Sequence, residues 1–220
     1  MVIFKLKSLL KSLALVLSGV ALQACQQNAE LGEVLVYEND FSQENLQNIS
    51  NGRLREFNEK LVLGNFSNEE IALTLHDLPA HKNLKIEIEL LLHDSWDGNA
   101  DAVSGPDSWY FNLDDQTALH ATFSNQPCVS TFCLSQSYPD VYGSHEDPRT
   151  GADEVELPGL CKYADSAGWT SQYSISKIIR HKGSSMTLVC GDQTVQNYLE
   201  TSHRCDESWS LSKIAVIIVE

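Results

Sequence analysis

Residues 84–92 read LKIEIELLL, and this stretch decides the fold class. Its aliphatic side chains fall on every second position: Leu84, Ile86, Ile88, Leu90 and Leu92. The positions between them carry a lysine, two glutamates and a leucine. A period of two residues is that of a β-strand with one buried face. We therefore predict a half-buried strand here, the strongest in the sequence.

Apolar runs of similar length recur through the rest of the chain, separated by Gly, Pro, Asn and Asp. They cover residues 34–37, 61–63, 71–75, 109–113, 119–123, 173–179, 186–190 and 214–219. Strong helical periodicity is absent after residue 25, and residues 123–169 form a long segment with few apolar runs. Segments of that length without structure are uncommon unless they are functional. The pattern predicts an all-β fold, a jelly roll or another β-sandwich.

The N-terminal residues predict the location of the protein. Three lysines precede the apolar run LALVLSGVAL at residues 13–22, which is too short to cross a bilayer comfortably. The run ends in Leu22-Gln23-Ala24-Cys25. This sequence resembles a bacterial lipobox, with an aliphatic residue three positions before the cysteine and a small residue directly before it. The alternative is an ordinary secretory signal with a coincidental cysteine.

The lipobox resemblance implies cleavage before Cys25 and attachment of diacylglycerol to its thiol. Gln26 follows, and without an aspartate there the pattern implies sorting to the outer membrane. We therefore expect a signal peptide over residues 1–24, a lipid-anchored tether over residues 25–33 and a β-sandwich domain over residues 34–220. The lipid on Cys25 would be the attachment to the bilayer of the cell envelope.

The charge of the mature chain limits its partners. Cleavage removes three of the 15 Lys and Arg residues and no acid, which leaves 12 cations against 30 Asp and Glu and a formal charge of −18. Such a surface repels phosphate backbones, so nucleic acid is excluded as a partner. The chain of 196 residues that remains is long enough for one domain with a sizeable core.

Oxygen ligands gather directly after the strong strand. The loop contains Asp94, Asp97, Asn99, Asp101 and Asp107, with Gly98 and Gly105 between them. Ca²⁺ takes six to eight oxygen ligands from a backbone that can turn sharply, so these residues are candidate calcium ligands. The spacing is not that of an EF-hand, and the alternative is that the aspartates cap turns.

A second candidate calcium site follows from the order of the strands. The first and last strands of a sandwich often lie side by side, and each carries a pair of acids: Glu38, Asp40, Asp206 and Glu207. Either site would stabilise the folded state, because an ion that binds only the folded chain adds its binding free energy to stability.

The cysteines other than Cys25 are five in number, so one stays unpaired. Exported proteins can keep disulfides. Cys128 and Cys133 could close a small loop, and Cys190 and Cys205 could join two neighbouring strands. Cys161 is then left over and is expected to be buried. No CxxC or HxxxH spacing supports a zinc site instead.

With these segments in place, the chain resembles a group of exported bacterial lipoproteins with a β-sandwich domain. The resemblance covers almost all of residues 37–219. Its motifs, in order along the chain, are Asp40-Phe41, Leu63-Gly64-Asn65-Phe66, Leu78-Pro79-Ala80-His81, Asp94-Ser95-Trp96-Asp97-Gly98, Gly105-Pro106-Asp107-Ser108-Trp109, Phe123-Ser124-Asn125, Gln136-Ser137-Tyr138-Pro139, Arg149-Thr150-Gly151-Ala152 and Asp206-Glu207-Ser208-Trp209.

This resemblance implies a jelly-roll, concanavalin-like or galactose-binding-like sandwich, the architecture of many carbohydrate-binding modules. The family usually has Gly, an aliphatic residue and Asp-Asn-Val in its last strand, where this chain has Ser210-Leu211-Ser212-Lys213-Ile214. If that Asp is a metal ligand in the family, Ser212 weakens or removes one ligand here. Because a fold does not confer a function, the function must come from a site.

Aromatic side chains are candidates for contact with a sugar ring. We single out Trp96, Tyr138 and Tyr142 as ligand-facing candidates, although Trp96 also fits a position packed beneath the acidic loop. Trp109 and Trp209 are expected in the core or under the acidic loops.

An enzyme is not predicted. Glu87 and Glu89 point outward from the strong strand, but the Glu-x-Asp-x-x-Glu pattern of sandwich glucanases is absent, as are Gly-x-Ser-x-Gly and Gly-rich phosphate loops. The first hypothesis is a lipid-anchored, calcium-stabilised binding module for a glycan or another extracellular ligand. A structural or adhesive surface lipoprotein acting through protein contacts is the alternative, and a carbohydrate-active enzyme is the weakest.

Overall fold

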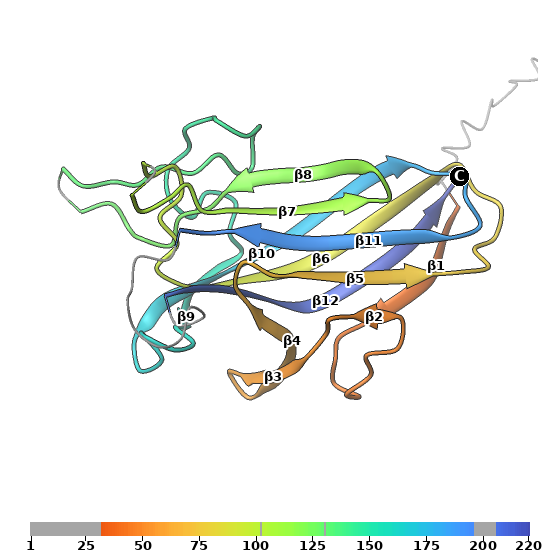
Figure 1. Ribbon diagram of the computed structural model, residues 1–220, viewed down its shortest axis with the longest axis horizontal. Coiled ribbons are helices and arrows are strands. Elements are labelled where there is room, and N and C mark those ends of the chain that lie inside the picture. Colours follow the sequence, from red (N-terminus) through yellow and green to blue (C-terminus); the bar gives the residue numbers. More distant parts are fainter. Residues whose placement is uncertain (1–31, 102, 130, 196–205) are drawn as a thin grey trace, which may run out of the picture. The chain divides into compact units, whose positions relative to one another are not determined.

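The protein is a sandwich of two antiparallel β-sheets. The computed structural model describes residues 32–101, 103–129, 131–195 and 206–220, and Figure 1 shows the two sheets lying face to face. The described residues contain no helix, and so none that is long and apolar enough to cross a membrane. The predicted all-β sandwich is confirmed.

The larger sheet has seven strands. Its order is β3-β4-β12-β6-β10-β9, and β1 also pairs with β12. The bounds are β1 (Glu33–Asn39), β3 (Leu54–Phe57), β4 (Lys60–Phe66), β6 (Asn83–Asp94), β9 (Glu154–Pro158), β10 (Ala167–Arg180) and β12 (Glu207–Val219).

The smaller sheet has five strands in the order β2-β5-β11-β7-β8. Its members are β2 (Ile49–Ser50), β5 (Glu70–Leu75), β7 (Ser108–Leu113), β8 (Gln116–Thr122) and β11 (Met186–Gln193). The apolar runs seen in the sequence correspond to nine of the strands in the two sheets. The strands β2, β3 and β9 were not predicted, because they are short and carry little apolar sequence.

The core lies between the two sheets. The strong strand β6 places Leu84, Ile86, Ile88, Leu90 and Leu92 against it, each at most 1% exposed. Trp109 and Trp209 are completely buried in the same core, as predicted, and their rings meet at 5.9 Å. Removing large apolar side chains from water is the dominant favourable contribution to folding.

The last strand changes phase in its middle. Trp209 and Leu211 face the core, and after a bulge between Leu211 and Lys213 the inward positions begin again at Ile214. One extra residue in a strand moves all later side chains to the other face unless a bulge absorbs it. Ser212 is the residue absorbed, so Ser212 and Lys213 both lie on the outer face of the sheet.

Two strands share one edge of β12. The strand β4 pairs with residues 209–211, and β1 pairs antiparallel with residues 214–219. The first and last strands are therefore neighbours, as predicted, but Glu38 lies opposite Ala215, far along β12 from Asp206 and Glu207. This register separates the two halves of the second predicted calcium site.

The sandwich has two distinct ends, which differ in the length of the connections they carry. The terminal end is where β1 starts and β12 finishes, together with the connections at residues 76–82, 114–115 and 181–185. The loop end carries the connections at residues 95–107, 123–153 and 159–166.

The cysteine pairing differs from the prediction. Cys128 and Cys133 form a disulfide, as predicted. Cys190, however, is a free thiol, completely buried, because it has the inward phase of β11 and points into the core. The predicted bridge from Cys190 to Cys205 is therefore wrong. Cys161, expected to be unpaired, is disulfide-bonded and partly exposed, and Cys205 lies outside the described residues.

Candidate functional site

The loop after β6 turns sharply at the loop end of the sandwich. Asp94 and Gly98 both have positive φ angles, of 65° and 61°. A side chain at Gly98 would place its Cβ 2.3 Å from the backbone oxygen of Ser135, so only glycine fits. Trp96 is buried between them and donates from Nε1 to the carbonyl oxygen of Ser208 at 3.0 Å.

This turn brings three carboxyl groups together. One oxygen from each of Asp97, Asp107 and Glu207 lies within 4.8 Å of the others. Asp107 and Glu207 are buried, and Asp97 is half-buried. The cluster thus combines two members of the first predicted calcium site with one member of the second.

Backbone hydrogen bonds hold Asp107 in place. Its Oδ2 accepts from the N–H of Asp97 at 2.7 Å, and its Oδ1 accepts from the N–H of Val195 at 3.0 Å. Asp97 in turn accepts from the side-chain amide of Gln126 at 2.6 Å. The positions of these two carboxyl groups are therefore fixed by the fold.

Asp206 stands next to the cluster and is tied to a cation. Its Oδ1 accepts from Lys162 at 3.0 Å and from the hydroxyl of Ser95 at 2.9 Å. Its negative charge adds to the field that the buried carboxyl groups experience.

Burial makes the carboxyl groups of the cluster unusually weak acids. Desolvation raises the pKa of Asp97 to about 6, and it raises that of Asp107 to about 7 against the hydrogen bonds from Asp97 and Val195. The pKa of Glu207 is also raised, first by burial and then by the charges of Asp107, Asp206 and Asp97. Three carboxylates of like charge, two of them buried and one half-buried, favour either protons or a bound cation.

The other predicted ligands of this loop do not join the cluster. Asp94 is buried, and its Oδ1 accepts from the backbone N–H groups of Leu160 and Tyr163, which hold the 159–163 turn. Asn99 donates to the carbonyl oxygen of Ser144 at 2.7 Å. Asp101 is exposed and accepts from the N–H of Val103, as a turn residue does.

Of the three aromatic side chains predicted to face a ligand, two are buried and one is exposed. Trp96 and Tyr138 were predicted to face a ligand, but they are 0% and 9% exposed and belong to the core. Tyr138 stacks on Phe123 at 4.9 Å, which accounts for its burial. Tyr142 is 49% exposed and stacks on His120, with ring centroids 4.4 Å apart.

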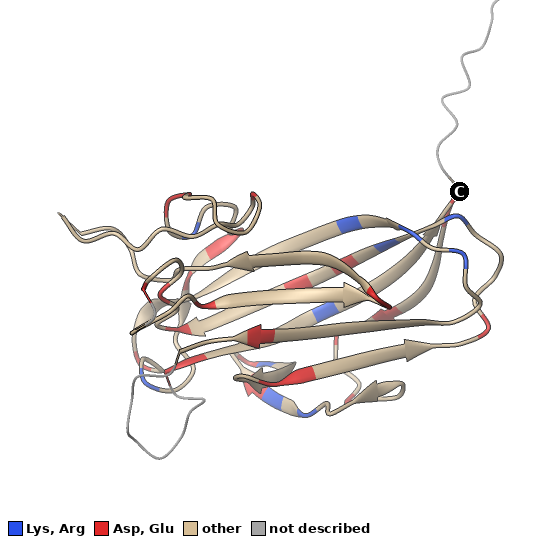
Figure 2. Ribbon diagram, turned by 45° about the horizontal axis from the view of Figure 1, so that its top comes forward, with Lys and Arg blue, Asp and Glu red and all other residues tan. Residues whose placement is uncertain are grey.

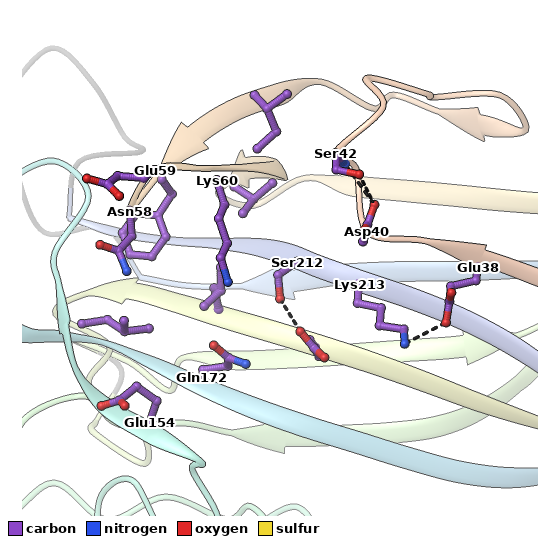
Figure 3. Close-up of a pocket in the computed structure, with 16 residues that line it drawn as sticks. Glu38, Asp40, Ser42, Asn58, Glu59, Lys60, Glu154, Gln172, Ser212 and Lys213 are labelled. Atoms are coloured by element: carbon purple, nitrogen blue, oxygen red, sulfur yellow. Dashed lines mark hydrogen bonds and ion pairs between the residues drawn. The ribbon is translucent and has the colours of Figure 1, made fainter.

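A groove lies on the outer face of the seven-stranded sheet (Figure 3). It has a volume of about 900 Å³. The turn between β3 and β4 supplies one wall, and β9 and β10 supply the other, with β6 and β12 beneath. The side chains that line it are Glu38, Asp40, Ser42, Phe57, Asn58, Glu59, Lys60, Leu61, Val62, Glu89, Leu91, Glu154, Leu157, Gln172, Ser212 and Lys213.

The floor of the groove is apolar. Phe57, Val62 and Leu91 are buried there in a small cluster separate from the main core, with Leu157 packed against them. Leu91 faces outward because it falls between the inward positions of β6. This patch gives the groove a surface on which an apolar face of a ligand can pack.

Polar groups stand over this floor. The hydroxyl of Ser212 donates to Oε2 of Glu89 at 2.9 Å, and Lys213 forms an ion pair with Glu38 at 2.8 Å. The side-chain amide of Gln172 lies on the wall formed by β10 (Figure 3). The groove carries five carboxyl groups and two lysines, so its formal charge is −3.

The four residues of the second predicted calcium site do not come together, and two of them line this groove instead. Glu38 and Asp40 lie in it, where Glu38 pairs with Lys213 and Asp40 accepts from Ser42 at 2.7 Å. Ser212, which the family pattern places at a possible metal ligand, also lies in the groove and not at the Asp97 cluster. The sequence signal for the groove was the outward phase of Glu89, but nothing in the sequence placed residues 57–62 and 154–157 beside it.

Comparison with known proteins gives likenesses of fold alone. No family model matches the chain, and no curated protein matches it in sequence. A family 115 4-O-methyl-α-glucuronidase with specificity for decorated arabinogalactans superimposes with a TM-score of 0.41 and 10% identity. The alignment covers 85% of this chain, which spans only 18% of that enzyme's length.

Two carbohydrate-binding modules of family 6 are similar over their whole length. The module at the C-terminus of a marine laminarinase from Zobellia galactanivorans has a TM-score of 0.36 and 8% identity, covering 84% of this chain and 98% of the module. A module of the Cellvibrio mixtus lichenase 5A, solved with cellotriose, has a TM-score of 0.34 and 9% identity, covering 86% and 98%.

Proposed function

We propose that this protein is a lipid-anchored binding module of the bacterial cell envelope that holds a glycan in the groove on its seven-stranded sheet. The observation that carries the proposal is the groove itself: an open trough with an apolar floor and hydrogen-bonding side chains on both walls. Ligand sites combine an apolar lining with a few polar groups that fix orientation.

The polar side chains of the groove suit sugar hydroxyls. Carboxylates such as Glu89 and Glu154 accept hydrogen bonds from hydroxyl groups, and the amides of Gln172 and Asn58 both donate and accept. The C–H face of a sugar ring would pack on Leu91 and its neighbours. Because the groove has a formal charge of −3, it would repel uronic acids and sulfated sugars, so the glycan is expected to carry no negative charge.

Binding of neutral oligosaccharides by the full protein in detergent tests the proposal. We expect Glu89→Gln and Gln172→Ala each to weaken binding of a glycan identified on an array by about tenfold, as loss of a hydrogen bond of about 1.4 kcal/mol would. Glu87→Gln is the matched control, because Glu87 lies on the same strand and face but outside the groove lining. Equal affinity for all three variants and the wild type would rule out the groove as the site.

The lipid anchor on Cys25 is a separate part of the proposal, supported by the lipobox-like residues 22–25. Replacing Cys25 with serine should move the protein from the detergent phase to the aqueous phase on phase separation. If the variant partitions like the wild type, Cys25 does not carry the anchor.

Calcium is the third part. Asp97, Asp107 and Glu207 would hold the ion, because carboxylate oxygens are the ligands that Ca²⁺ prefers and their mutual repulsion would be relieved by it. The ion would stabilise the loop end and would take no part in ligand contact, since the groove lies on the sheet face and is lined by other residues.

An adhesive surface lipoprotein is the alternative function, and one observation favours it. Large apolar side chains are exposed on the loops of the loop end: Val103, Val129 and Val141 are 73%, 61% and 71% exposed. Exposed apolar residues that gather on loops can mark protein contacts. Loss of cell-surface adhesion in a Val129→Ser, Val141→Ser variant that still binds glycan would favour this alternative.

A further inference from the structure

Apolar side chains also lie exposed at the terminal end of the sandwich. Leu35, Ile217, Lys85 and Ile178 are consecutive cross-strand partners of β1, β12, β6 and β10, so they form one row across the outer face, in which Ile217 is buried. Leu35 is 55% exposed and Ile178 is 59% exposed. Val34, next to Leu35, is 54% exposed.

The terminal end is electrically neutral, whereas the rest of the chain is strongly acidic. Residues 33–36, 76–86, 113–117, 176–188 and 216–220 contain five cations, Lys82, Lys85, Lys177, Arg180 and Lys182, against five acids, Glu33, Asp77, Asp114, Asp115 and Glu220. The rest of the chain after residue 24 has 7 cations and 25 acids, so it carries the whole net charge of −18. Figure 2 shows several blue segments at this end, with red segments beside them.

The cations nearest the row are free to reach outward. Arg180, Lys182 and Lys82 are exposed, and Arg180 follows Ile178 on the same face of β10. Lys85 lies within the row and pairs with Glu33 at 2.9 Å. Long basic side chains beside exposed aliphatic ones are the composition of surfaces that rest on a membrane, where the stems lie along apolar material and the charges meet phosphate groups.

The chain also enters the sandwich at this end. Glu33 is the first residue of β1, eight residues after Cys25. Eight residues span at most about 28 Å when fully extended. If Cys25 carries lipid, as proposed above, the terminal end is therefore the part of the sandwich held nearest the bilayer.

We propose that the terminal end lies against the surface of an anionic phospholipid bilayer, with Leu35 and Ile178 in the interface and Arg180, Lys182 and Lys82 on the headgroup phosphates. This inference rests on the proposed lipid anchor. It turns the loop end, with its cluster of buried carboxyl groups, away from the membrane, and it leaves the groove open along the side of the sandwich.

Depth-sensitive fluorescence on the acylated protein tests this orientation. Leu35→Cys and Ile178→Cys are each labelled with an environment-sensitive dye and reconstituted in vesicles of phosphatidylethanolamine and phosphatidylglycerol that contain acyl-brominated lipid. Val141→Cys is the matched control, an exposed aliphatic position at the opposite end. The unsubstituted protein measures background labelling, which should be small because Cys190 is buried.

We expect brominated lipid to reduce the emission at positions 35 and 178 by about twofold and to leave position 141 unchanged. Unquenched dye at both terminal positions on protein that floats with the vesicles would overturn the orientation while the anchor stands. Quenching at position 141 alone would also overturn it. If the protein fails to float with the vesicles, both the anchor and the orientation are overturned. Glycan binding is measured without vesicles and is therefore tested independently of both.

Discussion

The backbone N–H of Asp97 donates a 2.7 Å hydrogen bond to the carboxyl group of Asp107, ten residues later in the chain. This bond closes the acidic loop and places the two carboxyl groups within 4.8 Å of each other and of Glu207. Their repulsion is therefore a property of the folded state and is absent from the unfolded chain, where the groups separate. The stability of the folded state should therefore depend on the calcium ions or protons that neutralise these carboxyl groups.

Calcium should raise the melting temperature through this cluster. At ten times its dissociation constant the ion adds RT ln 11, about 1.4 kcal/mol, which is a shift of about 3–5 °C for a domain of this size. Asp97→Asn should lose most of the shift, whereas Asp101→Asn, an exposed turn residue, should keep it. The measurement is a melting curve in EGTA and in millimolar Ca²⁺, and identical curves for the wild type would contradict a stabilising site.

Without calcium, stability should fall as the pH rises. The pKa values of Asp97 and Asp107 are raised to about 6 and about 7, above the value near 4 of an unfolded aspartate. The folded state therefore binds protons more tightly, and the stability they provide is complete below about pH 4 and is lost as the pH passes 6 to 7. In EGTA the melting temperature should be lower at pH 8 than at pH 5.

The variant Asp97→Asn, Asp107→Asn is the control for this pH dependence. It removes two of the titrating groups, so its melting temperature should change less between pH 5 and pH 8 than that of the wild type. A wild-type protein that becomes more stable over this range in EGTA would show that other groups dominate.

Thiol chemistry should separate the cysteines clearly. Cys190 is buried and burial raises the pKa of its thiol, so it should not react with a thiol reagent in the folded protein. Under denaturing, non-reducing conditions Cys190 should react, and peptide mapping should show Cys128 joined to Cys133. By the cysteine count, Cys205 is the expected partner of Cys161 if Cys25 carries lipid. A peptide that joins Cys190 to Cys205 would contradict this pairing.

Asp192 should be important for stability at the end of β11. Its buried carboxyl group accepts from the backbone N–H groups of Asn68 and Glu69 and, at 2.7 Å, from Nε1 of Trp209. Asp192→Asn replaces one acceptor with a donor that faces N–H groups, and we expect a loss of about 2–3 kcal/mol in urea unfolding. Asp115→Asn, on an exposed turn, should change stability by less than about 0.5 kcal/mol.

The main strands could be read from the sequence because their signal is local. Alternation in residues 84–92 predicts both the strand and its buried face, and the structure buries the aliphatic residues it indicates. The short strands β2, β3 and β9 were not predicted, because they lie at sheet edges, where a strand needs little apolar sequence. The change of the inward-facing positions within β12 was not predicted either, since a bulge is defined by the pairing with the partner strand.

The candidate sites depended on contacts that are distant in sequence. The sequence indicated Asp97, Asp107 and Glu207 as acidic candidates, but it assigned them to two different sites, because the meeting of residue 207 with the 94–107 loop requires the pairing of β12 with β6. Similarly, Tyr138 was expected at the surface because its segment lacks regular structure, yet its ring packs in the core against Phe123.

The position of β12 has a consequence for the order in which the chain can fold. It is the last strand along the described residues, yet it lies inside the seven-stranded sheet, with β6 on one edge and β4 and β1 on the other. A nascent chain that still lacks residues 207–219 has no partner for β1 and a gap in the middle of the sheet. We therefore expect the seven-stranded sheet to form only after residues 207–219 are available to pair with β6, β4 and β1.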